Sequence, residues 1–122
     1  DPRKGFWTLP AGFMEVGETV EDAAKREARE EANADISLGQ VLAVYSVPRI
    51  AQVHVMFRAE LVSDISPGPE SEEVALFDWK DLPWANLAFP TVVWALTHFS
   101  SVRNRAAFVP FSNPPGTEQL IR

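Results

Sequence analysis

The feature that most constrains this chain is an acidic segment, residues 15–31, which holds six glutamates and one aspartate. Thr19 is followed three residues later by Asp22, and this capping-box pattern marks the start of an α-helix. Most of the residues that follow are good helix formers, and Asn33 tolerates the left-handed backbone conformation that ends many helices. The sequence therefore predicts a helix over residues 20–32.

The charged residues of this helix fall on two faces, because successive residues lie about 100° apart around its axis. One face carries charges of both signs, which is typical of a solvated surface. Its residues are Glu21, Asp22, Lys25, Arg26 and Arg29. The other face, which we expect to be turned toward the protein, combines carboxylates with small or apolar residues. Its residues are Glu27, Glu30, Glu31, Val20, Ala23 and Ala24.

Carboxylates that share an inward face repel one another, and burying any of them is costly unless a positive charge compensates it. Hard divalent cations take carboxylate oxygens as ligands, and Mg²⁺ commonly bridges protein carboxylates to substrate phosphates. A half-exposed face whose glutamates pair with Arg or Lys would fit the same pattern. The helix geometry alone leaves the metal site and the paired surface as equal alternatives.

The rest of the chain predicts an α+β protein, a mixed α/β/α sandwich in which helices cover a mostly antiparallel sheet. Strands are expected where β-forming residues are frequent or alternate with polar ones. The predicted strands cover residues 5–9, 36–47, 51–61 and 74–79. Pro90 suits the first turn of a helix, which predicts a second helix over residues 91–102. One face of the third strand is apolar and consists of Val53, Val55, Phe57, Ala59 and Leu61.

The length of 122 residues and the hydrophobic fraction of 46% suit a single globular domain. We expect residues 1–102 to form this domain and residues 103–122 to be a tail that either packs on it or is loose. The chain starts at Asp1 without a methionine, and a strand-like run follows almost at once. We therefore expect that earlier residues of the protein are missing.

Charge and composition argue against several classes of partner. The net charge is -6, whereas binding to a nucleic-acid backbone needs a basic surface, so an acidic protein that handles phosphates needs a cation as intermediary. No apolar run reaches the roughly 18 residues that a membrane span requires, so we expect no membrane partner. These residues include no cysteine, which excludes disulfides and cysteine-ligated zinc among them and fits a reducing, cytoplasmic setting.

A longer pattern runs through the acidic segment and the turn ahead of it. Its fixed positions are Gly12, Glu18, Arg26, Glu27, Glu30 and Glu31, with Ala28 and Ala34 at two aliphatic positions. The spacing resembles the Nudix box, although Asn33 stands where the family has glycine. By this resemblance the chain is identified as a member of the Nudix hydrolases, whose fold is a mixed sheet flanked by the box helix and a C-terminal helix. The resemblance implies hydrolysis of a nucleoside diphosphate linked to another group, with Mg²⁺ or Mn²⁺ as cofactor.

The resemblance also implies roles for individual residues. The metal ligands would be the side chains of Glu27, Glu30 and Glu31 and the backbone carbonyl of Ala11. Glu18 and Arg26 would join the loop to the helix and orient the glutamates for catalysis. We expect Asn33 to cost a little stability without loss of catalysis, because asparagine can replace glycine in a left-handed cap.

Several glutamates are candidates for the general base that takes the proton of the attacking water. Residues 69–77 resemble a later loop of the family, in which a glutamate approaches the metals as base or ligand. Glu70 and Glu73 match the spacing of that loop, although a loop rich in proline and glutamate is as readily a solvated one. The candidates are therefore Glu30, Glu70 and Glu73, and the sequence does not choose among them.

The stretches around the box resemble, more narrowly, dinucleotide pyrophosphatases of the family that act on FAD and ADP-ribose. The implied products are AMP and a second phosphorylated compound. The alternatives are a Nudix nucleoside triphosphate pyrophosphatase and a nucleotide-sensing domain without catalysis. Phe6, Trp7, Phe13 and Tyr45 are candidates for contacts to the nucleotide substrate, although aromatic residues in so small a domain are more often core. The resemblance also suggests a homodimer.

Overall fold

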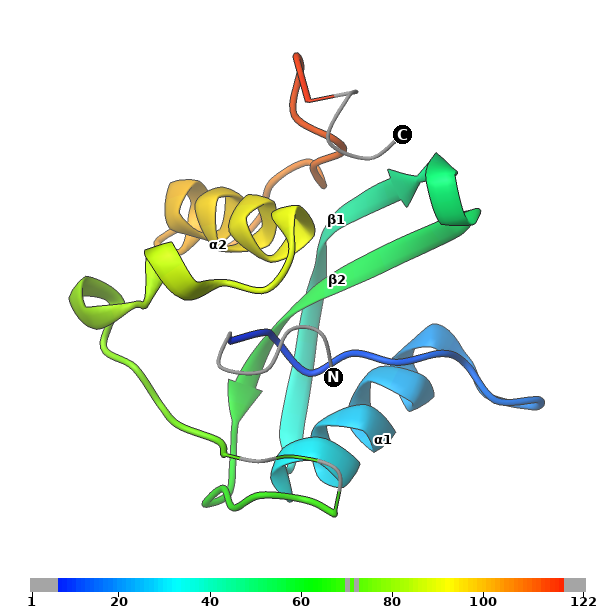
Figure 1. Ribbon diagram of the computed structural model, residues 1–122, viewed down its shortest axis with the longest axis vertical. Coiled ribbons are helices and arrows are strands. Elements are labelled where there is room, and N and C mark those ends of the chain that lie inside the picture. Colours follow the sequence, from blue (N-terminus) through cyan, green and yellow to red (C-terminus); the bar gives the residue numbers. More distant parts are fainter. Residues whose placement is uncertain (1–6, 70, 72, 118–122) are drawn as a thin grey trace. The chain divides into compact units, whose positions relative to one another are not determined.

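The computed structural model describes residues 7–69, 71 and 73–117 (Figure 1). Within these residues the elements are α1 (Val20–Ala32), β1 (Ile36–Val47), β2 (Gln52–Leu61) and α2 (Pro90–Val102). The two strands pair with one another and are joined by a 3₁₀ turn at Pro48–Ile50, so they form an antiparallel hairpin. The α+β prediction is confirmed. Neither helix of the described residues has the length and hydropathy needed to cross a bilayer.

The chain divides into two compact units. The α1 unit comprises the described residues of 9–39 and 59–83. The α2 unit comprises the described residues of 1–8, 40–58 and 84–122. The acidic segment lies in the α1 unit, and most of the hairpin lies in the α2 unit.

The prediction for α1 is confirmed at both ends of the helix. The Thr19 hydroxyl accepts a hydrogen bond from the Asp22 N–H at 3.1 Å, and the Asp22 carboxylate accepts one from the Thr19 N–H at 3.3 Å. This reciprocal pair satisfies two of the backbone donors that a helix start leaves without partners. At the other end Asn33 adopts φ 48° and ψ 33°, the left-handed cap that the sequence predicts.

The core of the α1 unit is small. Its buried alanines and the partly buried residues packed against them are Ala28, Ala32, Ala34, Ile36, Ile65 and Val74. The sequence predicts that Val20 also faces inward, but the structure leaves Val20 exposed. Val20 lies in the first turn of α1, at the opposite end of the helix from this cluster, so the cluster does not cover it.

The core of the α2 unit is aromatic. Tyr45 is completely buried, and its hydroxyl is hydrogen-bonded to Nδ1 of His98. The ring of Tyr45 meets that of Trp94 edge to face, with 5.4 Å between the ring centroids. His98 also stacks on Phe111, with 4.1 Å between the ring centroids. These rings link β1, α2 and the C-terminal tail.

The described part of the tail packs on β1. The Phe111 N–H donates to the Leu42 carbonyl, and the Val44 N–H donates to the Phe111 carbonyl, both at 2.9 Å. The side chain of Asn113 accepts a hydrogen bond from the Ser46 N–H at 2.9 Å and donates one to the Ser46 carbonyl at 3.0 Å. β1 is thus hydrogen-bonded both to β2 and to the tail.

The strand predicted over residues 74–79 is wrong. Residues 74–78 are irregular, and Trp79–Asp81 forms a short 3₁₀ turn. The sheet of the described residues consists of β1 and β2 alone. The β-forming residues of this segment therefore pair with neither β1 nor β2. A high β-propensity does not produce a strand where no neighbouring strand accepts its hydrogen bonds.

Two further predictions about strands need correction. Of the strand predicted over residues 5–9, the described part contains an isolated parallel bridge between Trp7 and Leu87 rather than a continuous strand. The strand predicted over residues 51–61 is present as β2, but its apolar face is not buried throughout, because Val53 and Leu61 are exposed. Alternation predicts which side chains share a face, but it does not show what covers that face.

Candidate active site

The turn at residues 10–12 lies against α1. The Ala11 N–H donates a hydrogen bond to Oε2 of Glu31 at 2.8 Å. Gly12 approaches Glu27 so closely that a Cβ atom at Gly12 would stand 2.2 Å from the carboxyl carbon of Glu27. A residue without a Cβ atom is required for this approach. The turn therefore meets two of the predicted metal-binding glutamates.

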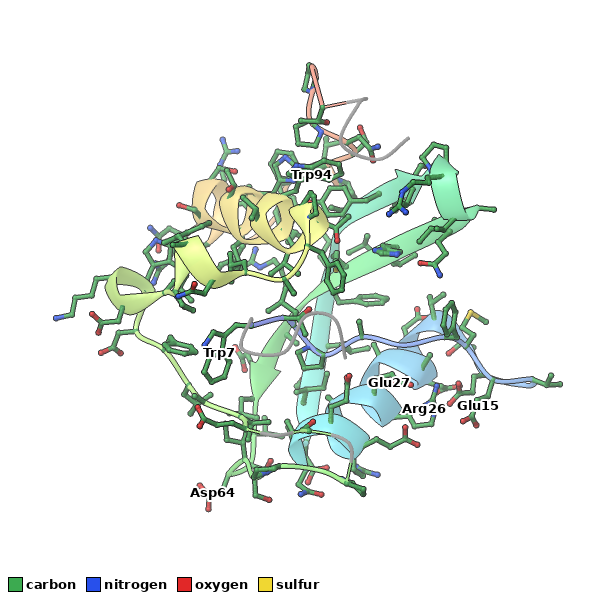
Figure 2. The ribbon with its side chains drawn as sticks, in the orientation of Figure 1. Trp7, Glu15, Arg26, Glu27, Asp64 and Trp94 are labelled. Atoms are coloured by element: carbon green, nitrogen blue, oxygen red, sulfur yellow. The ribbon has the colours of Figure 1, made fainter. Side chains whose placement is uncertain are left out.

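Arg26 joins the loop ahead of α1 to the helix (Figure 2). Its Nε donates to Oε2 of Glu18 at 2.7 Å, and its Nη2 donates to the carbonyl oxygen of Phe13 at 2.7 Å. Glu18 also accepts a hydrogen bond from the Glu15 N–H at 2.8 Å. These contacts hold the loop against the helix, which is the arrangement that the Nudix resemblance implies for Glu18 and Arg26.

Arg26 also contacts carboxylates of its own helix. Its Nη1 is hydrogen-bonded to Glu27 and lies 3.0 Å from Oε2 of Glu30. Arg26 is half-buried, so the prediction that it belongs to the solvated face is wrong. The loop folds back over this part of α1 and supplies Glu18 as a partner, which a projection of the helix alone does not reveal.

These contacts change the proton affinity of both partners. The hydrogen bond from Arg26, followed by the bond from the Glu15 backbone, lowers the pKa of Glu18 below its usual value. The hydrogen bond to Glu18 raises the pKa of Arg26, and the neighbouring Glu27 adds to this effect. Arg26 and Glu18 therefore remain a charged pair at neutral pH, which keeps the loop joined to the helix.

The predicted metal-binding glutamates differ in their surroundings. The side chain of Glu27 is 14% exposed, whereas that of Glu30 is 56% exposed. Within the described ranges, no group of three or more acidic or histidine side chains is arranged to hold a metal ion. The donors themselves suit a hard divalent cation, which prefers carboxylate and carbonyl oxygens. Glu27 and Glu31 lie beside the backbone of the turn, where Gly12 contributes no side chain.

A second loop contacts the C-terminal end of α1. The Ser66 N–H donates to the Ala32 carbonyl at 2.9 Å, and the Gly68 N–H donates to the Glu31 carbonyl at 3.1 Å. The Ser71 hydroxyl donates to the same Glu31 carbonyl at 2.7 Å. These bonds satisfy carbonyls that a helix end leaves without intrahelical partners. The sequence did not predict this docking, for which a glycine between two prolines was the available signal.

The candidates for the general base are described only in part. Glu30 and Glu73 are both exposed, the first on α1 and the second just after the docked loop. Glu70 lies outside the described residues, as does Phe6 among the candidates for substrate contacts. Glu30, Glu70 and Glu73 therefore all stay candidates for the base.

The described aromatic candidates lie in different environments. Phe13, in the α1 unit, is 74% exposed, so its ring is accessible to a ligand. Trp7, in the α2 unit, is half-buried and is fixed by backbone hydrogen bonds to Asn86 and Ala88, both at 2.7 Å. Tyr45 has no exposed surface in the α2 core, so it cannot contact a nucleotide from this position. Its burial also raises the pKa of its hydroxyl.

Comparison with known proteins identifies the family to which this chain belongs. A model of the NUDIX domain matches residues 1–95, which is most of the chain. The chain belongs to the Nudix family, as its box predicts.

Individual relatives share both sequence and fold with the chain. An ADP-ribose pyrophosphatase of Methanocaldococcus jannaschii is 36% identical over 94 residues, which cover 73% of this chain and 54% of the relative. An NAD-capped RNA hydrolase, NudC, of Stutzerimonas stutzeri is 36% identical over 81 residues, which cover 65% of this chain and 29% of the relative. The crystal structure of a NUDIX hydrolase from Nitrosomonas europaea superposes with a TM-score of 0.85 and 43% identity, covering 93% of this chain and 66% of that chain.

These matches confirm the predicted Nudix fold. They also show that this chain is shorter than its relatives. It spans about half the length of the ADP-ribose pyrophosphatase and less than a third of NudC.

Proposed function

We propose that this chain hydrolyses the pyrophosphate bond of a nucleoside diphosphate linked to another group, with ADP-ribose or FAD as substrate and Mg²⁺ or Mn²⁺ as cofactor. The products would be AMP and a second phosphorylated compound. The observation that carries the proposal is the contact of Glu27 and Glu31 with the turn at residues 11–12. The similarity to an ADP-ribose pyrophosphatase supports the choice of substrate.

The reaction requires charge compensation, because the phosphate oxygens repel an incoming water molecule. A bound divalent cation would supply positive charge to the diphosphate and lower the pKa of the attacking water. Glu27, Glu30 and Glu31 would hold the cation through their carboxylates, with the Ala11 carbonyl as a further ligand. Arg26 keeps Glu27 and Glu30 close together in spite of their repulsion, because its guanidinium contacts both carboxylates.

A carboxylate must also accept the proton of the attacking water. Glu30 and Glu73 are exposed to solvent, as a group that exchanges protons with water must be at some stage of the cycle. Glu70 is the third candidate. Replacing each of the three by glutamine and following turnover against pH would identify the base, since only its loss removes the acidic limb of the profile.

The substrate is tested by product analysis. The protein is incubated with ADP-ribose, FAD, NADH and dGTP, each with and without Mg²⁺, and the products are separated by chromatography. AMP released from ADP-ribose or FAD only in the presence of the metal supports the proposal. Turnover of dGTP alone would instead favour a nucleoside triphosphate pyrophosphatase, and binding without turnover would favour a nucleotide-sensing domain.

The metal assignment is tested by Glu31→Gln. Glutamine keeps an oxygen for the Ala11 N–H but removes the negative charge, so the fold should persist. Turnover should fall by about a hundredfold, the scale on which loss of one electrostatic contact at a reacting group acts. Glu21→Gln, an exposed position on the same helix, is the matched control and should retain full activity. Undiminished turnover in Glu31→Gln would refute the assignment.

A further inference from the structure

Asn33 occupies the one position of the box at which this chain departs from the Nudix pattern. Its backbone does what the family's glycine would do, because it adopts the left-handed conformation and its N–H donates to the Arg29 carbonyl at 2.9 Å. A glycine would satisfy both requirements with less strain. The backbone alone therefore gives no reason for an asparagine at this position.

The side chain of Asn33 makes contacts that glycine cannot make. Its Nδ2 lies 2.9 Å from the hydroxyl oxygen of Ser66 and 3.2 Å from the Ser66 carbonyl oxygen. The same nitrogen lies 3.1 Å from the carbonyl oxygen of Pro67. An amide nitrogen has two hydrogens to donate, so three acceptors around it leave neither hydrogen without a partner. The carboxamide thus holds two consecutive residues of the second loop.

The residues held by Asn33 continue directly into the docking of that loop on α1. Ser66 and Gly68 donate their N–H groups to carbonyls of the last turn of the helix. Gly68 is buried and so close that a Cβ atom there would stand 1.6 Å from the carbonyl oxygen of Glu30. The loop therefore rests on the backbone that carries Glu30 and Glu31, and it leads within a few residues to Glu73.

We propose that Asn33 is a positioning residue, which fastens the loop containing Ser66–Gly68 to the end of α1 and thereby places Glu73 relative to the glutamates of the box. The role in catalysis depends on the proposed hydrolase function, whereas the fastening itself does not. On this proposal, asparagine in place of the family's glycine adds side-chain contacts to the second loop. Asn33 would act on Glu73 indirectly, through the loop, because its side chain contacts Ser66 and Pro67.

The fastening is tested first without substrate, by amide hydrogen exchange in the wild-type protein and in Asn33→Gly. Glycine preserves the left-handed backbone and removes only the carboxamide, so the variant should fold. The Ser66 and Gly68 amides should exchange about tenfold faster in the variant, as expected when the net contribution of one or two hydrogen bonds is lost. The amides in the middle of α1 should be unchanged. Equal exchange of the loop amides in the two proteins would overturn the proposal.

The catalytic consequence is tested by kinetics. Asn33→Gly should lower kcat about tenfold with little change in KM, because a small displacement of a reacting group acts on the transition state. Ser66→Ala removes one of the three acceptors and should have a smaller effect in the same direction. Asn104→Gly, an exposed asparagine in the α2 unit, controls for the substitution itself and should leave kcat unchanged.

A double-mutant cycle with Glu73→Gln separates positioning from a general loss of structure. If Asn33 acts by placing Glu73, then Asn33→Gly should lower kcat much less in the Glu73→Gln background than in the wild type. Additive effects, or an unchanged kcat for Glu73→Gln alone, would overturn the proposal. Absence of any hydrolysis by the wild-type protein would count against the proposed function, and the exchange experiment would still decide whether Asn33 fastens the loop.

Discussion

The α1 unit and the α2 unit are held together in contrasting ways. The apolar cluster of the α1 unit is built largely on alanines, and its specific contacts are polar, with Arg26 at their centre. The α2 unit is organised around Tyr45, whose buried ring lies next to Trp94 and His98. One unit depends on charge and on close backbone approaches, and the other depends on the volume of its buried rings.

On the proposed function, the difference follows from what each unit must expose. A group of carboxylates can bind a cation only if it remains accessible and charged, and charges are too costly to bury in an apolar core. The specific contacts of the α1 unit are ion pairs and hydrogen bonds, and several of them involve its carboxylates. The aromatic core of the α2 unit carries no such requirement, so its rings can be buried. Substitutions in the two units should accordingly have different kinds of effect.

The largest effect on stability should come from Tyr45→Ala. Removing a buried aromatic ring leaves a cavity and should lower the free energy of unfolding by about 3–5 kcal/mol. Denaturant unfolding followed by fluorescence measures this change. Tyr45→Phe keeps the ring, loses only the hydrogen bond to His98, and should cost about 1 kcal/mol. A loss below about 1 kcal/mol for Tyr45→Ala would break the comparison, since the α2 unit would then not depend on this ring.

Gly12→Ala should instead act mainly on turnover. Its Cβ atom would collide with the carboxylate of Glu27, so either the turn or that side chain must move. Turnover should fall about a hundredfold, as displacements of roughly 1 Å near a reacting group can cause. Gly17→Ala is the control within the same loop, because a Cβ there meets no atom within 4 Å, although its φ of 90° adds backbone strain. Equal loss of turnover in the two variants would contradict the steric explanation.

The smallest effect should be a difference in acid sensitivity between the units. Burial lowers the pKa of His98 below its ordinary value of 6.5, so as the pH falls below 6.5 the unfolded chain binds a proton that the folded protein resists. The free energy of unfolding should therefore decline from pH 6.5 downward. The lowered pKa of Glu18 contributes stability above its ordinary value of 4.5, and this contribution is lost only as the pH falls further, through the folded-state pKa.

Denaturant unfolding at a series of pH values distinguishes the two groups. His98→Gln should flatten the decline just below pH 6.5 and leave the decline below pH 4.5 in place. Glu18→Gln should do the reverse. An unchanged slope below pH 6.5 in His98→Gln would show that another group is responsible.

The parts of the molecule that the sequence predicts well are those specified by neighbouring residues. The ends of α1 follow from Thr19, Asp22 and Asn33, which act within one turn of the helix. The prediction that Arg26 is solvated is wrong, because its main partner, Glu18, comes from a loop that folds back on the helix. A helical projection contains no information about such a loop.

The candidate site shows the same contrast between features specified by neighbouring residues and contacts to distant ones. The resemblance to the box singles out Glu27, Glu30 and Glu31. In the structure Glu31 accepts the Ala11 N–H and Glu27 lies against Gly12, whereas Glu30 is exposed. The docking of the second loop joins Asn33 to Ser66, 33 positions further along the chain, and no local pattern specifies a contact at that distance. The burial of Tyr45 likewise depends on residues of α2, such as His98, which lie far from it in sequence.

The hydrogen bonds of the tail have a consequence for how the chain is made. Gln40 is bonded to Phe108, 68 positions later, and Ser46 is bonded to Asn113, 67 positions later. Closing loops of this length costs entropy that only the completed contacts repay. During synthesis β1 must wait for these late residues to leave the ribosome before the α2 unit can close. A premature stop codon shortly before Phe108 would therefore release a chain without Phe111, the ring that stacks on His98 in the aromatic core.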